Sequence, residues 1–99
     1  MSDANDVEVT IEERGSGGVY RALVDGHPAE MTFSRVSPKL IIIDHTDVPD
    51  ALRGRGIGQI LVKRAVDEAR SVGGKIIPLC PFAAAQFRRY ADYSDVLSR

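Results

Sequence analysis

Residues 52–58 constrain the fold of this 99-residue chain more than any other segment. Their sequence, LRGRGIG, has three glycines in five positions and stands between an apolar run and a segment with helical periodicity. Glycine lets the backbone turn tightly, so that successive N–H groups can point toward one place at the start of a helix. The segment therefore predicts a strand, a tight loop and a helix in direct succession, with a loop that attracts an anion such as phosphate.

Two arginines, Arg53 and Arg55, add positive charge to this glycine loop. From the loop alone, phosphate binding and a simple helix start with solvated arginines are both open. A mononucleotide-binding loop requires Lys and then Ser or Thr after its last glycine, whereas Gly58 is followed by Gln59. The dinucleotide-binding pattern requires wider glycine spacing in a repeated β-α-β array, and this sequence shows a single such unit. Neither of these two known loops therefore fits.

The first half of the chain has the two-residue periodicity of strands with one buried face. Strands are expected at about residues 7–12, 19–24, 29–33 and 40–46. Turn-forming residues separate them: a GSGG segment, an Asp-Gly pair and a Ser-Pro pair. Because these connections are short, the four strands are expected to form an antiparallel meander.

The second half of the chain changes to helical periodicity. Residues 56–72 read as an amphipathic helix, and a Gly-Gly pair ends it. Residues 75–79 read as a short fifth strand, which a right-handed crossover would place parallel to the fourth. Pro78 has no N–H to donate, so either pairing breaks there or the strand lies at an edge of the sheet. A second helix at about residues 81–90 and a short tail complete the chain, which gives an α/β (α+β) fold.

Three segments together resemble one family. They are the R-x-x-G-x-G pattern that begins at Arg53, the HTDVP segment at 45–49 and the PLCPF segment at 78–82. In combination they are similar to motifs of a small single-domain branch of the GNAT superfamily, the acyl-CoA-dependent N-acetyltransferases. These segments cover roughly residues 40–90.

The resemblance implies a compact, truncated acyl-CoA N-acyltransferase fold. A chain of 99 residues is expected to form a single domain over residues 1–99, with residues 1–6 as a flexible tail. In that superfamily the fourth and fifth strands splay apart, and the pantetheine arm of coenzyme A enters the gap. The usual member also has helices after its first strand and two strands after its last helix, for which this sequence shows no counterpart. The open edge this leaves suggests a homodimer.

The resemblance also implies that acetyl-CoA or coenzyme A is the cofactor. The loop would receive the pyrophosphate on its backbone N–H groups, and the end of the fourth strand would bind the pantetheine amides. The implied cofactor-binding residues are Thr46, Val48, Arg53, Gly54, Arg55, Gly56, Ile57 and Gly58. For Thr46 and Val48, ordinary packing at a strand end is the alternative.

Cys80 is the strongest single candidate for a catalytic residue. Pro81 suits the first position of a helix, which makes Cys80 its expected N-cap. A thiol at a helix N-terminus is stabilised as the reactive thiolate. Three roles are open: a nucleophile that relays the acyl group, a neutral wall of the pantetheine slot, or a buried inert cysteine.

His45 and Asp47 are weaker catalytic candidates. They share one face of the fourth strand if that strand is regular, and either could deprotonate an acceptor ammonium. The alternative is that Asp47 caps a turn and His45 is hydrogen-bonded at a strand end. The tyrosine that commonly protonates the departing thiolate in the superfamily is replaced by Phe87, and Tyr90 lies one turn further on. Two histidines and one cysteine at unrelated spacing predict no metal site.

Composition and net charge limit the classes of partner that this chain is expected to bind. The net charge is −1, which predicts no general attraction to nucleic acid or to a membrane surface. The longest purely apolar run, residues 40–43, is far too short to span a bilayer. The first six residues lack the pattern of a secretory signal, and a lone cysteine cannot form an internal disulfide. These features predict a soluble protein of the cytoplasm.

The favoured interpretation is an N-acetyltransferase that moves an acetyl group from acetyl-CoA to an amine, which the sequence does not identify. One alternative is a module of the same fold that binds CoA or acyl-CoA without significant turnover. Another is a small α/β interaction domain without a cofactor, whose arginine loop meets an acidic partner. Cofactor binding separates the last reading from the first two, and turnover separates those two.

Overall fold

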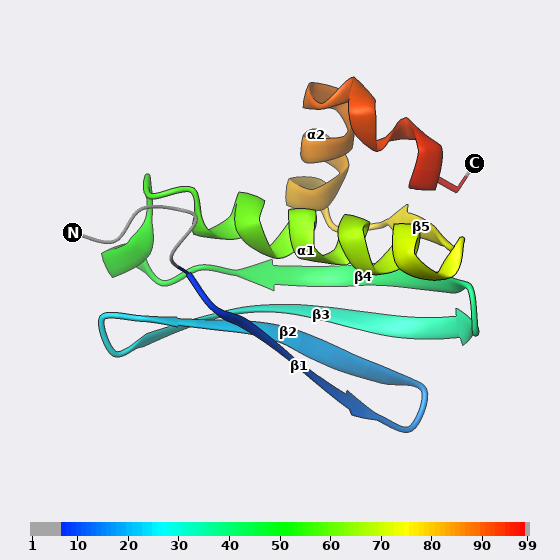
Figure 1. Ribbon diagram of the computed structural model, residues 1–99. Helices are drawn as coiled ribbons and strands as arrows, with labels where there is room; N and C mark the ends of the chain where they lie inside the picture. The colour runs from blue at the N-terminus through cyan, green and yellow to red at the C-terminus, as the bar shows by residue number, and fades with distance from the viewer. Residues whose placement is uncertain (1–6, 99) are drawn as a thin grey trace.

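A computed structural model describes residues 7–98, in which a five-stranded sheet carries two helices on one face (Figure 1). The strands lie in the order β1-β2-β3-β4-β5; the first four are antiparallel, and β5 is parallel to β4. The predicted fold class is thus confirmed. The expected flexible tail, residues 1–6, lies outside the described residues. The elements are β1 (Val9–Arg14), β2 (Gly17–Val24), β3 (His27–Ser37), β4 (Leu40–Asp47), η2 (Asp50–Leu52), α1 (Ile57–Val72), β5 (Lys75–Pro78), α2 (Pro81–Arg89) and η3 (Ala91–Val96).

The first hairpin is tighter than the sequence suggested. Arg14 pairs with Gly17, so Gly17 and Gly18 belong to β2 instead of the turn. The reason is a close approach of the strands: a Cβ on Gly18 would clash with the carbonyl oxygen of Glu12. These glycines therefore let β1 and β3 approach β2 closely, which a turn-centred interpretation of GSGG misses.

The second hairpin turns at Asp25 and Gly26, as predicted. Both have left-handed backbone conformations, with φ of 52° and 80°. Such a turn matches the twist of the strands that it joins. β3 then continues to Ser37, well beyond the predicted end at residue 33.

β4 contains an irregularity that the sequence did not reveal. Thr32 is paired with His45, but the next residue of β3, Phe33, is paired with Ile43. Asp44 is therefore an extra residue in β4, which makes a β-bulge. The bulge lies just before the segment predicted to bind the cofactor.

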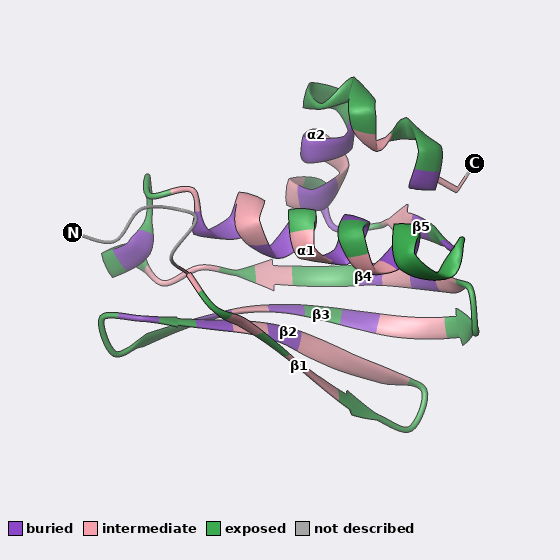
Figure 2. Cartoon of the chain, in the orientation of Figure 1, coloured by how far each residue is buried: buried purple, intermediate pink, exposed green. Residues whose placement is uncertain are grey.

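The core lies between α1 and the sheet, where buried residues of the helix face buried residues of the strands (Figure 2). Gly56 precedes α1 and Gly73 follows it, both with left-handed φ, and the helix has the predicted extent. The largest fully buried side chains are Met31, Ile43, Leu52, Leu61, Ile76, Val62 and Val66.

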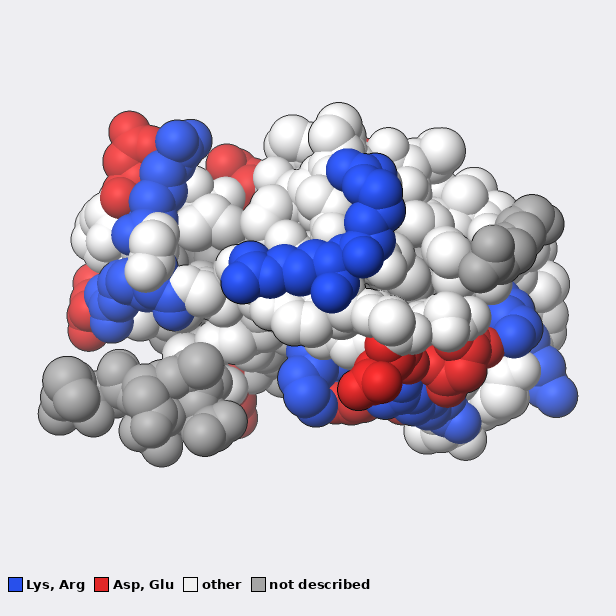
Figure 3. Space-filling view, turned by 90° about the horizontal axis from the view of Figure 1, so that it is seen from above, with Lys and Arg blue, Asp and Glu red and all other residues white. Residues whose placement is uncertain are grey.

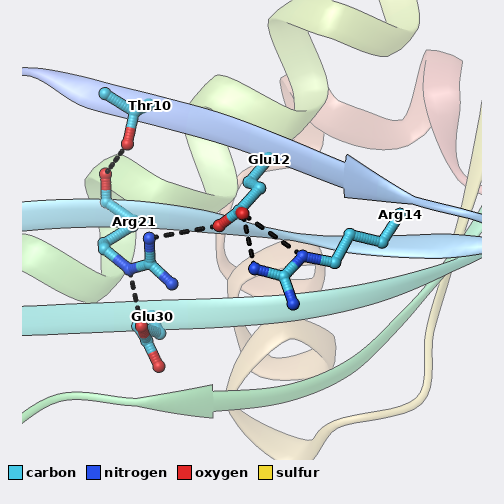
Figure 4. A network of polar contacts seen from close by, with 5 residues as sticks. All are labelled: Thr10, Glu12, Arg14, Arg21 and Glu30. Atoms are coloured by element: carbon cyan, nitrogen blue, oxygen red, sulfur yellow. Dashed lines mark hydrogen bonds and ion pairs between the residues drawn. The ribbon is translucent and has the colours of Figure 1, made fainter.

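Neither helix covers the other face of the sheet (Figure 1). On its β1–β3 side this face carries a network of charged side chains (Figure 4). Arg21 contacts Glu30 at 2.6 Å and Glu12 at 3.4 Å, and Arg14 also contacts Glu12. Since these groups are substantially exposed, their pairing keeps the face polar more than it stabilises the fold.

The C-terminal segment is more ordered than the short tail expected. The η3 turn is held to α1 by Arg70, which donates to both carboxylate oxygens of Asp95 at 3.0 Å. Leu97 then forms a parallel bridge with Ile76, and the N–H of Ser98 donates to the Ile76 carbonyl at 2.9 Å. Part of the free edge of β5 is therefore covered by the chain itself.

Within residues 7–98, no helix is both long and apolar enough to cross a bilayer. On the helix-bearing side, acidic and basic side chains lie beside one another at several places (Figure 3). This mixture agrees with the near-neutral net charge of −1.

Candidate functional site

The loop between β4 and α1 opens the N-terminus of the helix to a ligand. Gly54 and Gly56 have φ of 79° and 75°, a region that residues with a Cβ rarely adopt. Gly56 is the N-cap of α1 and provides no side-chain hydrogen bond to the first turn. The first turn also contains no acidic residue. Its N–H groups and the positive end of the helix dipole are therefore left for an external acceptor.

A hollow at this helix end is enclosed by β4, the glycine loop and the start of α2. It is lined by Thr46, Val48, Leu52, Arg53, Gly54, Gly56, Ile57, Gly58, Gln59 and Phe82. The structure thus brings together every predicted cofactor residue except Arg55. Three lining residues, Leu52, Gln59 and Phe82, were not predicted from sequence. The signal for Phe82 was its place two residues after Cys80 in the PLCPF segment.

Phe82 and Gly58 fit against each other at the base of this hollow. A Cβ on Gly58 would lie 2.6 Å from Cζ of Phe82. The missing side chain therefore lets α2 approach α1 and lets the aromatic ring form one wall. The third glycine of the loop has a packing role, unlike the first two, which have conformational roles.

The two loop arginines have different surroundings. Arg53 lines the hollow, and its Nε lies 2.9 Å from the Asp50 carboxylate. Arg55 points instead toward the β2–β3 hairpin, where it contacts Asp25 at 2.8 Å. Both pairs are well exposed and hence weak, so Arg53 can exchange its partner at little cost. The Arg55 pair connects the loop to the hairpin.

β4 and β5 separate next to this hollow, as the proline predicted. Their pairing ends with Ile43 opposite Pro78. The N–H groups of Leu79 and Cys80 then both donate to the Ile43 carbonyl, at 3.1 and 3.2 Å. Beyond this point β4 continues to Asp47 without β5 beside it. The end of β4 thus offers an unpaired backbone edge on the side of β5.

Cys80 lies at this point of separation and is the N-cap of α2, as predicted. Its Sγ accepts a hydrogen bond from the N–H of Ala83 at 3.4 Å and lies 3.4 Å from Oγ1 of Thr46. The residue is only 5% exposed. Thr46 connects the two regions, because it also lines the hollow. Both contacts fix the position of the sulfur at the start of α2.

His45 and Asp47 share one face of β4, but it is the face away from Cys80. Thr46 lies opposite Met31, which is buried on the helix side, whereas Asp47 lies opposite Glu30. Residues directly opposite in antiparallel strands share a face, and neighbours along a strand alternate. The structure therefore does not bring His45 or Asp47 together with Cys80.

Phe87 and Tyr90, near the end of α2, both pack against Tyr93. Phe87 is buried and packs edge-on against Tyr93, with ring centroids 5.7 Å apart. Tyr90 is 37% exposed and lines a different hollow on the outer side of α1. Among residues 7–98, no group of three or more His, Cys, Asp or Glu side chains is arranged to hold a metal ion.

Comparison with known proteins connects these features. The family model of the GCN5-related N-acetyl-transferases matches residues 19–96, a range that begins within β2 and ends with η3. The solution NMR structure of a GCN5-like protein from Staphylococcus aureus is 34% identical in sequence, with a TM-score of 0.68. That similarity covers 90% of this chain and 87% of the other.

Two curated relatives match a shorter stretch. Protein NATD1 of Xenopus tropicalis is 46% identical over 39 residues, which are 39% of this chain and 36% of that protein. Protein NATD1 of Homo sapiens is 44% identical over 39 residues, which are 39% of this chain and 34% of that protein. The matched segment thus spans about a third of the length of each relative.

Proposed function

Because this chain belongs to the GCN5-related N-acetyltransferase family, we propose that it transfers an acetyl group from acetyl-CoA to an amine. One observation carries the proposal: the uncapped N-terminus of α1 and the unpaired end of β4 line a single hollow. A pyrophosphate and an amide-bearing arm need these two features side by side.

The residues of the hollow fit the parts of coenzyme A. The N–H groups at the start of α1 are oriented to donate hydrogen bonds to two phosphates, and Gly54 and Gly56 keep the approach to the backbone free of side chains. Arg53 adds a charge-assisted contact when it exchanges Asp50 for phosphate. The backbone of Thr46 and Val48 binds the pantetheine amides as an added strand would. Bound acetyl-CoA supplies the activated acyl group as a thioester.

Cys80 is our candidate catalytic residue. Ala83 N–H and the Thr46 hydroxyl, each 3.4 Å from Sγ, would stabilise a thiolate. As a nucleophile, the Sγ thiolate forms a bond to the acetyl carbon while the thioester carbon–sulfur bond breaks and CoA leaves as its thiolate. The acceptor amine then attacks the acetyl carbon, the bond to Sγ breaks, and the proton that the amine loses passes to the CoA thiolate. As a slot residue, Cys80 only lines the path of the thioester. A base role for His45 or Asp47 requires the acceptor to approach from the opposite face of the sheet.

Binding is tested first, by thermal unfolding with CoA and acetyl-CoA. At 100 times the dissociation constant, a ligand that binds only the folded state stabilises it by about 2.7 kcal/mol. We expect both ligands to raise the melting temperature. A wild-type protein that shows no shift at millimolar CoA would contradict the proposed function.

Intact-mass spectrometry after incubation with acetyl-CoA then distinguishes the two possible roles of Cys80. If Cys80 relays the acetyl group, the wild-type protein gains one acetyl mass, while Cys80→Ser and Cys80→Ala gain none. Both variants should still bind CoA, because the phosphate loop is unchanged. If no adduct forms and both variants keep most of the acetyltransferase rate, Cys80 is a slot residue.

A second candidate function is a module of the same fold that binds CoA or acyl-CoA without significant turnover. It is favoured by Phe87, which occupies the position of the usual acid and is buried against Tyr93. Binding of acetyl-CoA without acetylation of any member of a broad amine panel would favour this alternative. For either function we propose a cytoplasmic protein without nucleic-acid or membrane partners; the single thiol, which is free, suits a reducing compartment.

A further inference from the structure

An inner hollow lies between the second half of α1 and strands β1 to β4, at the end of the helix away from the glycine loop (Figure 1). Its volume is about 80 Å³. None of the residues that line it also lines the hollow at the start of α1. The proposed acetyl transfer therefore makes no use of this inner hollow.

The inner hollow is lined by a buried tyrosine whose hydroxyl the fold does not use. Tyr20 is 3% exposed, and its ring packs against Phe33 with the ring centroids 5.1 Å apart. Its hydroxyl has no hydrogen-bond partner within residues 7–98, yet the only side-chain polar atom there that is sealed from solvent without a partner is Oε1 of Gln86. The Tyr20 hydroxyl therefore borders open space, and the space that this residue lines is the inner hollow. Since buried polar groups normally have a partner, this hydroxyl points to a ligand.

Both acidic side chains of the inner hollow already have cationic partners. Glu13 is paired with Arg35 at 3.0 Å, and Glu68 is paired with Arg64 at 3.2 Å. A cationic ligand would have to displace one of these arginines. The acidic side chains of the inner hollow are therefore not free for an ammonium group.

Two lysines also line the inner hollow, and one of them is free. Lys75 donates to the carbonyl of Asp95 at 2.6 Å. Lys39, in the turn between β3 and β4, forms no side-chain hydrogen bond or ion pair within residues 7–98. At the end of α1, the carbonyl of Ala69 already accepts from the N–H of Gly74 at 2.7 Å, which weakens the negative end of the helix dipole here. The charge left for a ligand is thus positive.

The remaining wall of the inner hollow is largely apolar. It includes Ile11, Ile41, Ala65 and Val72. A volume of about 80 Å³ is roughly half that of an engineered cavity of about 150 Å³ that holds benzene, so a ligand of about four to six non-hydrogen atoms fits. Burial also raises the pKa of Tyr20 to about 12, so its hydroxyl keeps its proton at neutral pH and can donate to an anion. These features suit a ligand with one anionic end and a short alkyl chain.

We propose that the inner hollow binds a small aliphatic monocarboxylate, with its carboxylate between the Tyr20 hydroxyl and the Lys39 ammonium. The hydroxyl donates a charge-assisted hydrogen bond, and Lys39 supplies the opposite charge. The alkyl chain then lies against the apolar wall and leaves water. This site is separate from the proposed coenzyme A site and does not depend on it.

The test is an amide NMR titration of the wild-type chain with sodium propionate, compared with sodium chloride at the same ionic strength. We expect saturable shifts of the amide signals around the inner hollow, with a dissociation constant of about 1–10 mM for so small a ligand. Propylamine, which has the same chain length and the opposite charge, should bind at least about tenfold more weakly, a difference typical of hydrogen bonds to charged groups.

Three variants locate the carboxylate. Tyr20→Phe should weaken propionate binding about tenfold, the effect of losing one hydrogen bond to a charged group. Lys39→Gln should weaken it about threefold, because an exposed charge contributes less. Lys63→Gln removes a positive charge from α1 outside the inner hollow, and this matched control should bind propionate as the wild type does. Lys39 is exposed, so its variant keeps the test valid if Tyr20→Phe disturbs the fold.

Each of four results would overturn the proposal. If propionate causes no saturable shift up to about 50 mM, the inner hollow holds only water. If propylamine binds as tightly as propionate, the sign assigned to the ligand is wrong. If a folded Tyr20→Phe binds propionate like the wild type, the hydroxyl does not contact the carboxylate. If Lys63→Gln loses as much affinity as Lys39→Gln, the effect is one of general charge and not of a site.

Discussion

At the scale of single residues, the three loop glycines differ in why they are needed. Gly54 and Gly56 adopt left-handed backbone conformations with open space around the Cα, whereas Gly58 is helical and faces Phe82. A side chain at Gly56 is therefore strained by the backbone, by about 1–2 kcal/mol. A side chain at Gly58 is opposed by one neighbouring ring.

This difference predicts the result of a double-mutant cycle. Gly58→Ala should lower the free energy of unfolding, because overpacking against Phe82 costs about 1–3 kcal/mol and helix propensity returns only about 1 kcal/mol. In a Phe82→Leu background the same substitution should cost at least about 1 kcal/mol less. Chemical denaturation of the four proteins measures this coupling. Gly56→Ala is the matched control, and its cost should not depend on residue 82; additive effects for Gly58 would contradict the contact.

Tyr20 predicts a loss of stability at alkaline pH. Burial raises the pKa of its hydroxyl to about 12, and Glu68 nearby adds to the effect. In the unfolded chain the pKa is about 10, so ionisation favours unfolding above that pH. The stabilising contribution is complete below pH 10 and is lost as the pH rises to 12, by about 3 kcal/mol in all.

Denaturation curves at several pH values check this prediction. Tyr20→Phe should remove most of the decline between pH 10 and 12, leaving the smaller effect of Tyr93, whose pKa burial also raises. Equal slopes for the variant and the wild-type protein would show that Tyr20 is not the source.

At the scale of elements, ion pairs connect the glycine loop to two different neighbours. Arg53 is paired with Asp50 just before the loop and lines the hollow, whereas Arg55 is paired with Asp25 in the β2–β3 hairpin. The two arginines are two residues apart, and the sequence gives no reason to distinguish them. The structure distinguishes them by their different partners.

The two arginines should therefore respond differently to the same substitution. Arg53→Gln is expected to weaken CoA binding about three- to fivefold, because an exposed charge is lost from the phosphate site. Arg55→Gln should leave CoA affinity unchanged and lower the free energy of unfolding by less than about 1 kcal/mol, an effect reduced in 1 M salt. Calorimetry and chemical denaturation measure the two effects. Weaker CoA binding in Arg55→Gln than in Arg53→Gln would reverse the assignment.

Sequence periodicity predicted the elements better than their details. The alternation in the strands and the apolar stripe of α1 reflect which side chains are buried. Burial can be predicted from sequence because apolar residue types are the ones most often buried. The bulge at Asp44 could not be predicted, since it depends on how β4 fits β3 and no residue type demands it. The ends of β2 and β3 were missed for a similar reason: strand length follows from pairing partners.

The candidate site likewise has some features that the sequence predicted and others that it could not predict. Glycine and proline have strong local preferences, so the loop and the end of β5 at Pro78 were predictable. The separation of Asp47 from Cys80 was not, because the face of each residue on β4 depends on tertiary packing. The part of Phe82 in the hollow arises only when α2 packs on α1.

At the scale of the whole molecule, the sheet has one covered face, one polar face and two unlike edges. Leu97 covers part of the β5 edge through its bridge to Ile76. No residue between 7 and 98 pairs with the outer edge of β1. The expected homodimer stays a prediction, and the structure moves its most suitable interface from β5 to β1.

Sedimentation equilibrium at tens of micromolar tests this association. We expect a mass above that of the 10.8 kDa chain, with an interface that excludes the charged network on the polar face. Arg21→Gln, which alters that network, should leave the association unchanged and serves as the control. A single 10.8 kDa species would contradict the dimer.

The separation of β4 and β5 at Pro78 also decides which part of the molecule can open. β1 to β4 are joined by short hairpins between strands that are neighbours in sequence, so they form one locally connected unit. Thr46 belongs to that unit, whereas Cys80 and Phe82 belong to α2, which follows the last paired residue of β5. We therefore expect α2 to open by partial unfolding while the meander stays intact. The hollow would then lie between two parts of the molecule that unfold separately. A ligand that fills it should slow amide hydrogen exchange in α2 far more than in the hairpins.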